Sequence, residues 1–96
     1  MNRVCVIDVV GLSQSVLGEY TPFLNAFVKR NHLGDIKPPM PALTTASQTT
    51  YLTGTTPSEH GIVANGWYDH SASEIQFWKQ SNKLVQAESI WTTAKK

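Results

Sequence analysis

The feature that most constrains this chain is an uncharged segment of 21 residues near its middle, Pro38–Ser58, which holds four of the five prolines and seven threonines. The prolines keep the start of the segment extended and prevent a helix from beginning early. We therefore expect a helix with Thr44 or Thr45 as its N-cap and Gly54 just past its end. Such a helix places a hydroxyl where free N–H groups favour an anion. The alternative is a Thr/Pro-rich loop with a weakly formed helix, in which the hydroxyl only caps.

The run Val4–Gly11 is β-branched and almost wholly apolar, without the alternation of a half-exposed strand. This pattern predicts a strand covered on both faces, as in a parallel sheet. Asp8 lies near its carboxyl end, where α/β sheets gather their ligands. Its carboxylate either binds a metal or substrate, or caps the following loop. Cys5 is the single cysteine, which excludes an internal disulfide, and we expect a buried free thiol.

The next segments predict a crossover helix and a second strand. Thr21 is a suitable N-cap, a proline follows it at the first helical position, and apolar side chains recur on one face as far as Arg30. Leu33–Lys37 would then form a second parallel strand. This alternation of strand, helix and strand is typical of an α/β fold.

The C-terminal third contains shorter elements. Glu59–Asp69 is expected to form turns, and its His60 is either a ligand or base, or a side chain that fixes the loop by hydrogen bonds. Glu74–Lys79 and Lys83–Gln86 are expected to pair as a small hairpin. Ser89 is the expected N-cap of a last helix.

Length and charge exclude several classes of protein. A chain of 96 residues has room for one small core. Its net charge of +1 argues against a module that binds duplex nucleic acid through phosphates. No apolar run approaches the ~20 residues of a membrane span, and the first residues do not have the pattern of a signal peptide. We therefore expect a cytoplasmic protein without a membrane partner.

Three segments together resemble a known family. They are the strand with its aspartate, Val6–Asp8, the turn Pro41–Thr44, and the motif Leu52–Ile62, which reads Leu-Thr-Gly-x-x-Pro-x-x-His-Gly-Ile. In this order and spacing they resemble the N-terminal part of the alkaline phosphatase superfamily, and most of all its type I phosphodiesterase/nucleotide pyrophosphatase branch. The resemblance implies a three-layer α/β/α domain with a mainly parallel sheet, of which residues 1–96 would be the incomplete N-terminal segment.

The resemblance also implies a site. Asp8 would ligate one of two divalent metal ions, with zinc the first expectation and manganese or magnesium as alternatives. Thr44, nine residues before the Thr-Gly pair, would contact the same metal and act as the nucleophile. A threonine hydroxyl needs such activation, because its own pKa is high. The implied function is a metal-dependent phosphoester hydrolase that forms a phosphothreonine intermediate on a small substrate such as a nucleotide.

Two departures leave alternatives open. Ser47 offers a short hydroxyl three residues after Thr44, where many relatives carry an asparagine, so a phosphomonoester or phosphonate substrate is also considered. The ligands that the family adds downstream lie outside these residues, so the chain alone is expected to be inactive. The competing class is a non-catalytic α/β module that binds anions. A phosphomutase is disfavoured, because those relatives usually carry serine at the position of Thr44. Uncovered sheet edges would promote self-association.

Overall fold

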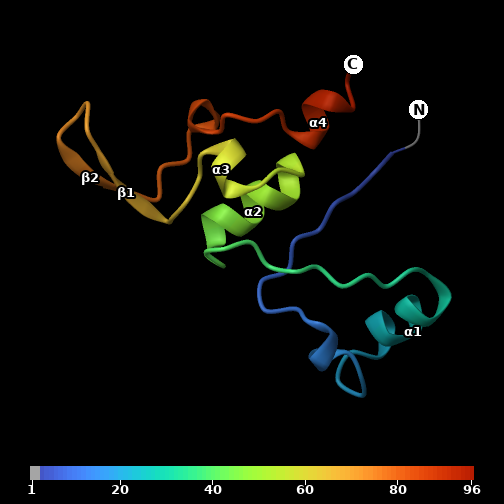
Figure 1. The fold of residues 1–96 in the computed structure, drawn as a ribbon. Helices are drawn as coiled ribbons and strands as arrows, with labels where there is room; N and C mark the ends of the chain where they lie inside the picture. The colour runs from blue at the N-terminus through green and yellow to red at the C-terminus, as the bar shows by residue number, and fades with distance from the viewer. Residues whose placement is uncertain (1–2) are drawn as a thin grey trace. The chain divides into compact units, whose positions relative to one another are not determined.

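The computed structural model describes residues 3–96, and the chain divides into two compact units, residues 1–35 and 36–96. The first contains a 3-10 turn, η1 (Gln14–Val16), and the helix α1 (Pro22–Arg30). The second contains all the remaining helices and strands (Figure 1).

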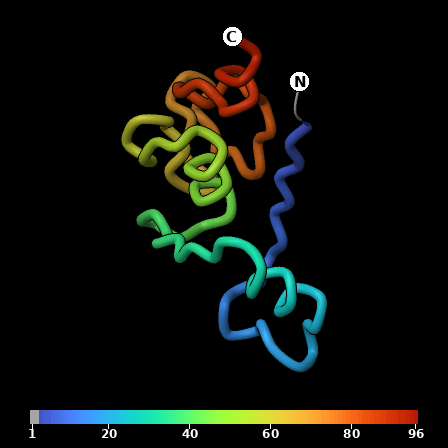
Figure 2. The backbone as a smooth tube through the Cα atoms, turned by 90° about the vertical axis from the view of Figure 1, so that its right-hand side faces the viewer, coloured from blue at the N-terminus to red at the C-terminus, as the bar shows by residue number. Residues whose placement is uncertain are grey.

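Helix α1 confirms the amphipathic helix expected from the sequence. It begins at Pro22, whose missing N–H costs nothing at the first helical position. Thr21 precedes it, and its hydroxyl donates to the carbonyl of Val16 at 2.9 Å and accepts from the N–H of Gly18 at 3.0 Å. The threonine thus closes the loop between η1 and α1 rather than capping the helix. Figure 2 shows the course of the backbone through this loop. Lys29 and Arg30 stand in the last turn, where cations complement the helix dipole.

The predicted strand at Val4–Gly11 was wrong for this structure, and so was the second strand at Leu33–Lys37. Both segments lack regular secondary structure, and no parallel pair of strands occurs in residues 3–96. A strand is defined by the partner that its N–H and C=O groups bond to, and apolar patterning cannot supply that partner. The side chains of the first run are exposed, and the thiol of Cys5 is exposed too, so the expectation of a buried thiol was also wrong.

The second unit is built around the helices α2 (Thr44–Thr53) and α3 (Pro57–His60), which contact each other. Gly54 ends α2 in the left-handed conformation with φ 68°, and its N–H donates to the carbonyl of Thr50 at 2.8 Å. The core of this unit consists of Ala46 and His60, both 0% exposed, with Ile62 at 7%. Two of these three residues lie on or beside α3, so the packing of α3 against α2 organises the unit.

The two strands of the second unit form an antiparallel hairpin of β1 (Gly66–Asp69) and β2 (Glu74–Phe77), in which Gly66 faces Phe77 and Asp69 faces Glu74. The strand at Glu74 was predicted, but its expected partner at Lys83–Gln86 was wrong. The turn is fixed instead by Asp69, whose Oδ1 accepts hydrogen bonds from the N–H and hydroxyl of Ser71 at 2.9 and 2.6 Å. An Asx turn of this kind connects β1 to β2.

The unit closes with a 3-10 turn, η2 (Asn82–Leu84), and the short helix α4 (Ile90–Thr93), which starts after Ser89 as expected. Between them the N–H of Gln86 donates to the carbonyl of His60 at 3.0 Å. This bond connects the last segment to α3. None of the helices in residues 3–96 is long and apolar enough to cross a bilayer.

Candidate active site

Thr44 is the first residue of α2 and its side chain is exposed. The N-cap position is occupied by Leu43, so the helix begins one residue earlier than a threonine cap would require. Leu43 makes no side-chain cap, and the first N–H groups of a helix have no partner within the helix. Thr44 therefore offers a free hydroxyl next to backbone donors, at the positive end of a ten-residue helix.

Thr45, the neighbouring threonine, is held differently. Its hydroxyl donates to the carbonyl of Ala64 at 2.7 Å and lies 3.0 Å from the Oδ1 of Asn65. Its backbone N–H donates to the same Oδ1 at 3.1 Å. Thr45 is half-buried, whereas Thr44 is exposed. The two hydroxyls thus have distinct environments, and only that of Thr44 is available to a substrate.

Asn65 is the residue that sequence reasoning undervalued. The sequence predicts turns throughout Glu59–Asp69, the segment that contains Asn65. The structure places the Asn65 carboxamide on the first turn of α2, 20 residues away in sequence from its partner Thr45. The only available signal was its side chain, an amide that can accept and donate at once. Ser47 has no amide in its side chain, and Asn65 brings one to the start of α2 from another segment of the chain.

Asp8 belongs to the first unit, whereas Thr44 belongs to the second. Its carboxylate lies in the exposed run 4–11. A carboxylate and a hydroxyl are oxygen donors that divalent cations accept. No cluster of three or more His, Cys, Asp and Glu side chains occurs in residues 3–96. That Asp8 and Thr44 ligate one metal ion therefore stays a prediction from the sequence, and a zinc site would need three or four protein ligands.

His60, the histidine of the motif, is fully buried and holds three segments together. Its Nδ1 accepts the N–H of Ile62 at 3.1 Å, so the proton is on Nε2, which donates to the hydroxyl of Thr50 at 3.0 Å. Burial lowers the pKa of His60, and the adjacent Glu59 carboxylate partly offsets this effect. Both ring nitrogens are occupied by protein. Of the two alternatives from the sequence, the loop-fixing hydrogen bonder is confirmed.

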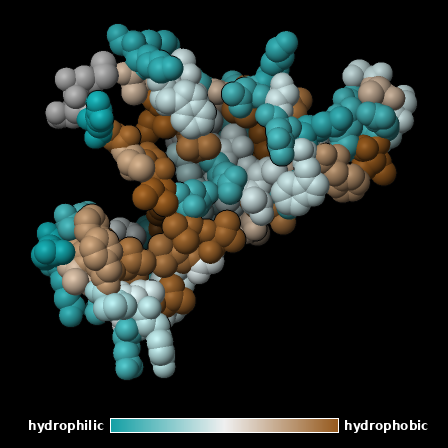
Figure 3. Space-filling model, turned by 180° about the vertical axis from the view of Figure 1, so that it is seen from behind, coloured by the Kyte–Doolittle hydropathy of each residue, from teal (hydrophilic) through white to brown (hydrophobic). Residues whose placement is uncertain are grey.

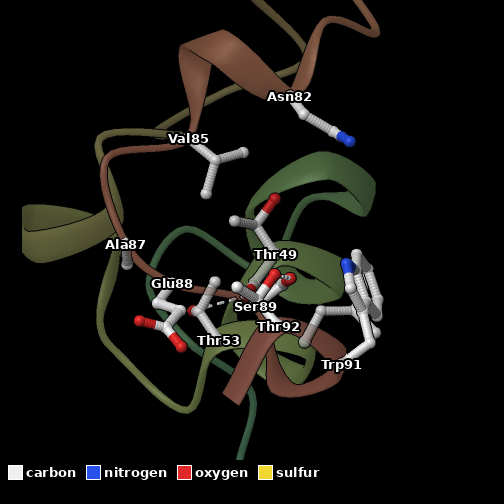
Figure 4. A pocket seen from close by; sticks show the side chains of 10 residues that line it. Thr49, Thr53, Asn82, Val85, Ala87, Glu88, Ser89, Trp91 and Thr92 are labelled. Carbon is white, nitrogen blue, oxygen red and sulfur yellow. Dashed lines mark hydrogen bonds between the residues drawn. The ribbon is translucent and has the colours of Figure 1, made fainter. Parts of the chain in front are cut away.

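A pocket of about 320 Å³ lies at the other end of α2 (Figure 4). Thr49 and Thr53 of α2 face Val85, Trp91 and Thr92 across it. These residues come from the C-terminal half of α2 and from the segment that carries η2 and α4. The pocket is therefore separate from the N-terminus of α2, where Thr44 and Asn65 lie.

An exposed threonine and a fixed carboxamide at one helix N-terminus form an arrangement suited to phosphate oxygens. The family model for type I phosphodiesterase/nucleotide pyrophosphatase matches residues 4–96, nearly the whole chain. The chain therefore belongs to the type I phosphodiesterase/nucleotide pyrophosphatase family. No solved structure matches it.

One curated relative adds to this match. It is an uncharacterized pyrophosphatase/phosphodiesterase of Schizosaccharomyces pombe, 30% identical over 103 aligned positions that cover 99% of this chain. The chain spans only 21% of that relative's length. The match supports membership of the family.

Proposed function

We propose that this chain contributes the nucleophile of a metal-dependent phosphoester hydrolase that acts on small phosphodiesters or pyrophosphates such as nucleotides. The observation that carries the proposal is the exposed hydroxyl of Thr44 on the first residue of α2, inside a segment that matches the family. The name of the yeast relative, a pyrophosphatase/phosphodiesterase, supports the same class of substrate.

In the proposed reaction the Thr44 Oγ1 attacks phosphorus, and an O–P bond forms while the bond to the leaving alcohol or phosphate breaks. The hydroxyl proton of Thr44 passes to solvent, and the leaving oxygen takes up a proton from solvent. Water then attacks the same phosphorus, the bond to Oγ1 breaks, and the proton of that water restores the Thr44 hydroxyl. The N–H of Thr44 and the positive end of helix α2 stabilise the charge that develops on the phosphoryl oxygens.

Asn65 completes the anion site in this proposal. Its Oδ1 is occupied by the N–H of Thr45, so the two N–H donors of its amide remain for a phosphoryl oxygen. Asp8 and Thr44 would hold a divalent cation together with further ligands from outside residues 1–96. Such a cation, when bound, lowers the pKa of a coordinated hydroxyl and neutralises phosphate charge. We accordingly propose that residues 1–96 are the N-terminal segment of a larger catalytic domain with an alkaline-phosphatase-like fold.

The test is hydrolysis of bis(4-nitrophenyl) phosphate in the presence of Zn²⁺, Mn²⁺ or Mg²⁺. It is measured on the 96-residue chain and on a version extended along its gene. We expect the extended protein to be active, Thr44→Ala to abolish turnover, and Thr44→Ser to retain part of it. The short chain is expected to be inactive, because two donors hold a cation weakly. Acid quenching during turnover should trap a phosphorylated peptide that contains Thr44.

Thr49→Val on the same helix is the matched control and should leave the rate unchanged. Activity that survives Thr44→Ala would refute the assigned nucleophile. An extended protein that binds phosphate but never hydrolyses the diester would favour the non-catalytic module. If 4-nitrophenyl phosphate or a phosphonate is hydrolysed faster than the diester, the preferred substrate is a phosphomonoester or a phosphonate.

A further inference from the structure

Thr45 makes the contacts that orient the site, although it cannot be the nucleophile. Its backbone N–H and its hydroxyl both reach a loop that lies 19 and 20 residues further along the chain. Thr45 is therefore the residue through which the start of α2 and the loop at Ala64 and Asn65 are fixed to each other.

The orientation of the Asn65 carboxamide follows from these contacts. Oxygen and nitrogen of an amide are assigned from their partners, and the partner here is a backbone N–H, which can only donate. The atom facing Thr45 N at 3.1 Å must therefore be Oδ1. A flipped amide would set two donors against each other. The NH₂ group is consequently turned away from Thr45.

The hydroxyl of Thr45 reinforces this arrangement. It has one proton, and the shorter contact of 2.7 Å assigns most of it to the Ala64 carbonyl, while the Asn65 Oδ1 at 3.0 Å receives the remainder of a bifurcated bond. Binding the loop backbone immediately before Asn65 restricts the Asn65 side chain as well. One side chain thus fixes both the position of the loop and the rotamer of the amide.

We propose that Thr45 is the positioning residue of the phosphate site, which holds the Asn65 carboxamide with its NH₂ group free for a phosphoryl oxygen beside Thr44. This inference rests on the proposed function for its consequence, but the orientation itself can be measured without turnover. Preorganised donors are effective because they need no rearrangement when the anion arrives.

The experiment is NMR on the 96-residue chain with inorganic phosphate as the probe. Scalar couplings and side-chain amide shifts report the Asn65 rotamer, and the Thr44 N–H reports phosphate. In the wild type we expect one Asn65 rotamer and a Thr45 N–H protected from exchange. Thr45→Val should give several Asn65 rotamers and about threefold to tenfold weaker phosphate binding, the worth of one net hydrogen bond. Thr45→Ser should restore both, and Thr49→Val should change neither.

An Asn65 rotamer that is unchanged in Thr45→Val overturns the inference, whatever happens to phosphate. If Thr45→Val does not fold, the wild type and Thr45→Ser decide: a shared single rotamer supports the inference, and a mobile Asn65 in the wild type overturns it. The nucleophile is tested separately. If Thr44→Ala proves active while Asn65 depends on Thr45, the proposed function fails and the positioning role stands.

Discussion

Gly66 is the residue at which the backbone leaves least room for a side chain. It faces Phe77 across the hairpin, and a Cβ built on it would lie 2.3 Å from the Phe77 Cδ1 and 3.0 Å from the Gln76 carbonyl oxygen. The aromatic ring thus lies directly over the glycine. Gly66 is required at the start of β1 for this reason.

We expect Gly66→Ala to destabilise the second unit by about 1–3 kcal/mol, because the ring must leave its rotamer or the strands must separate. Urea unfolding followed by tryptophan fluorescence measures the loss. Gly34→Ala is the control, since its Cβ would meet nothing within 4 Å. Equal midpoints for the two variants would show that Phe77 moves aside without cost.

At the residue scale, the sequence alone predicts the position of Thr44 closely. Proline at 41 and glycine at 54 bracket α2 from either end, so the position of Thr44 could be predicted to within one residue. The difference between Thr44 and Thr45 could not be derived locally. It depends on Asn65, which the folded chain brings to the helix from 20 residues away.

At the scale of the elements, His60 connects α2 to α3 and to the segment after it. Thr50 of α2 receives its Nε2–H, and the N–H of Ile62 is bound by its Nδ1. Glu59 is the adjacent charged group, and hydrogen bonds from the backbone N–H and the hydroxyl of Thr56 lower the pKa of its carboxyl. A protonated His60 would lose the Ile62 bond, because both ring nitrogens would then be donors.

This geometry predicts a pH dependence of stability. The pKa of His60 is lowered in the folded chain relative to about 6.5 in the unfolded chain. The unfolded state therefore binds more protons below pH 6.5, and the free energy of unfolding should fall as the pH falls from that value toward the folded pKa. Urea titrations between pH 7.5 and 5 measure this slope. Replacing the exposed His70 by glutamine should leave it intact, whereas His60→Gln should remove it. A slope unaffected by His60→Gln would contradict the assignment.

The elements differ in how far their own residues determine them. Helix α1 was predicted within one residue, because its proline, its apolar face and its terminal cations are all local signals. The hairpin partner was missed, because the Asx turn at Asp69 pairs β2 with the strand before it, and patterning does not show which neighbouring segment a strand will pair with. The first strand was overpredicted for a related reason. Its apolar run is suited to a sheet, but the described residues supply no partner strand.

At the scale of the whole molecule, the notable property is apolar surface. Side chains of the first run are among the most exposed, with Val4 at 85%, Ile7 at 77% and Val10 at 87%. Figure 3 shows apolar side chains at the surface on one face of the molecule. An extended apolar segment without a ladder partner also presents backbone donors and acceptors to another chain. The surface therefore favours contacts with a further strand.

We expect the 96-residue chain to self-associate as its concentration rises, because burying one such side chain contributes about 1.5–3 kcal/mol. Sedimentation velocity over a concentration series measures the association. Ile7→Lys should shift it to higher concentration, since a charge in an apolar run opposes edge pairing. Tyr20→Lys adds the same charge at a residue that is 95% exposed but lies outside the run, and should have little effect. Equal shifts for the two variants would mean that net charge, rather than the segment 4–10, controls association. A chain that stays monomeric throughout would contradict the prediction. The apolar segment 4–10 would then remain exposed to solvent without a partner.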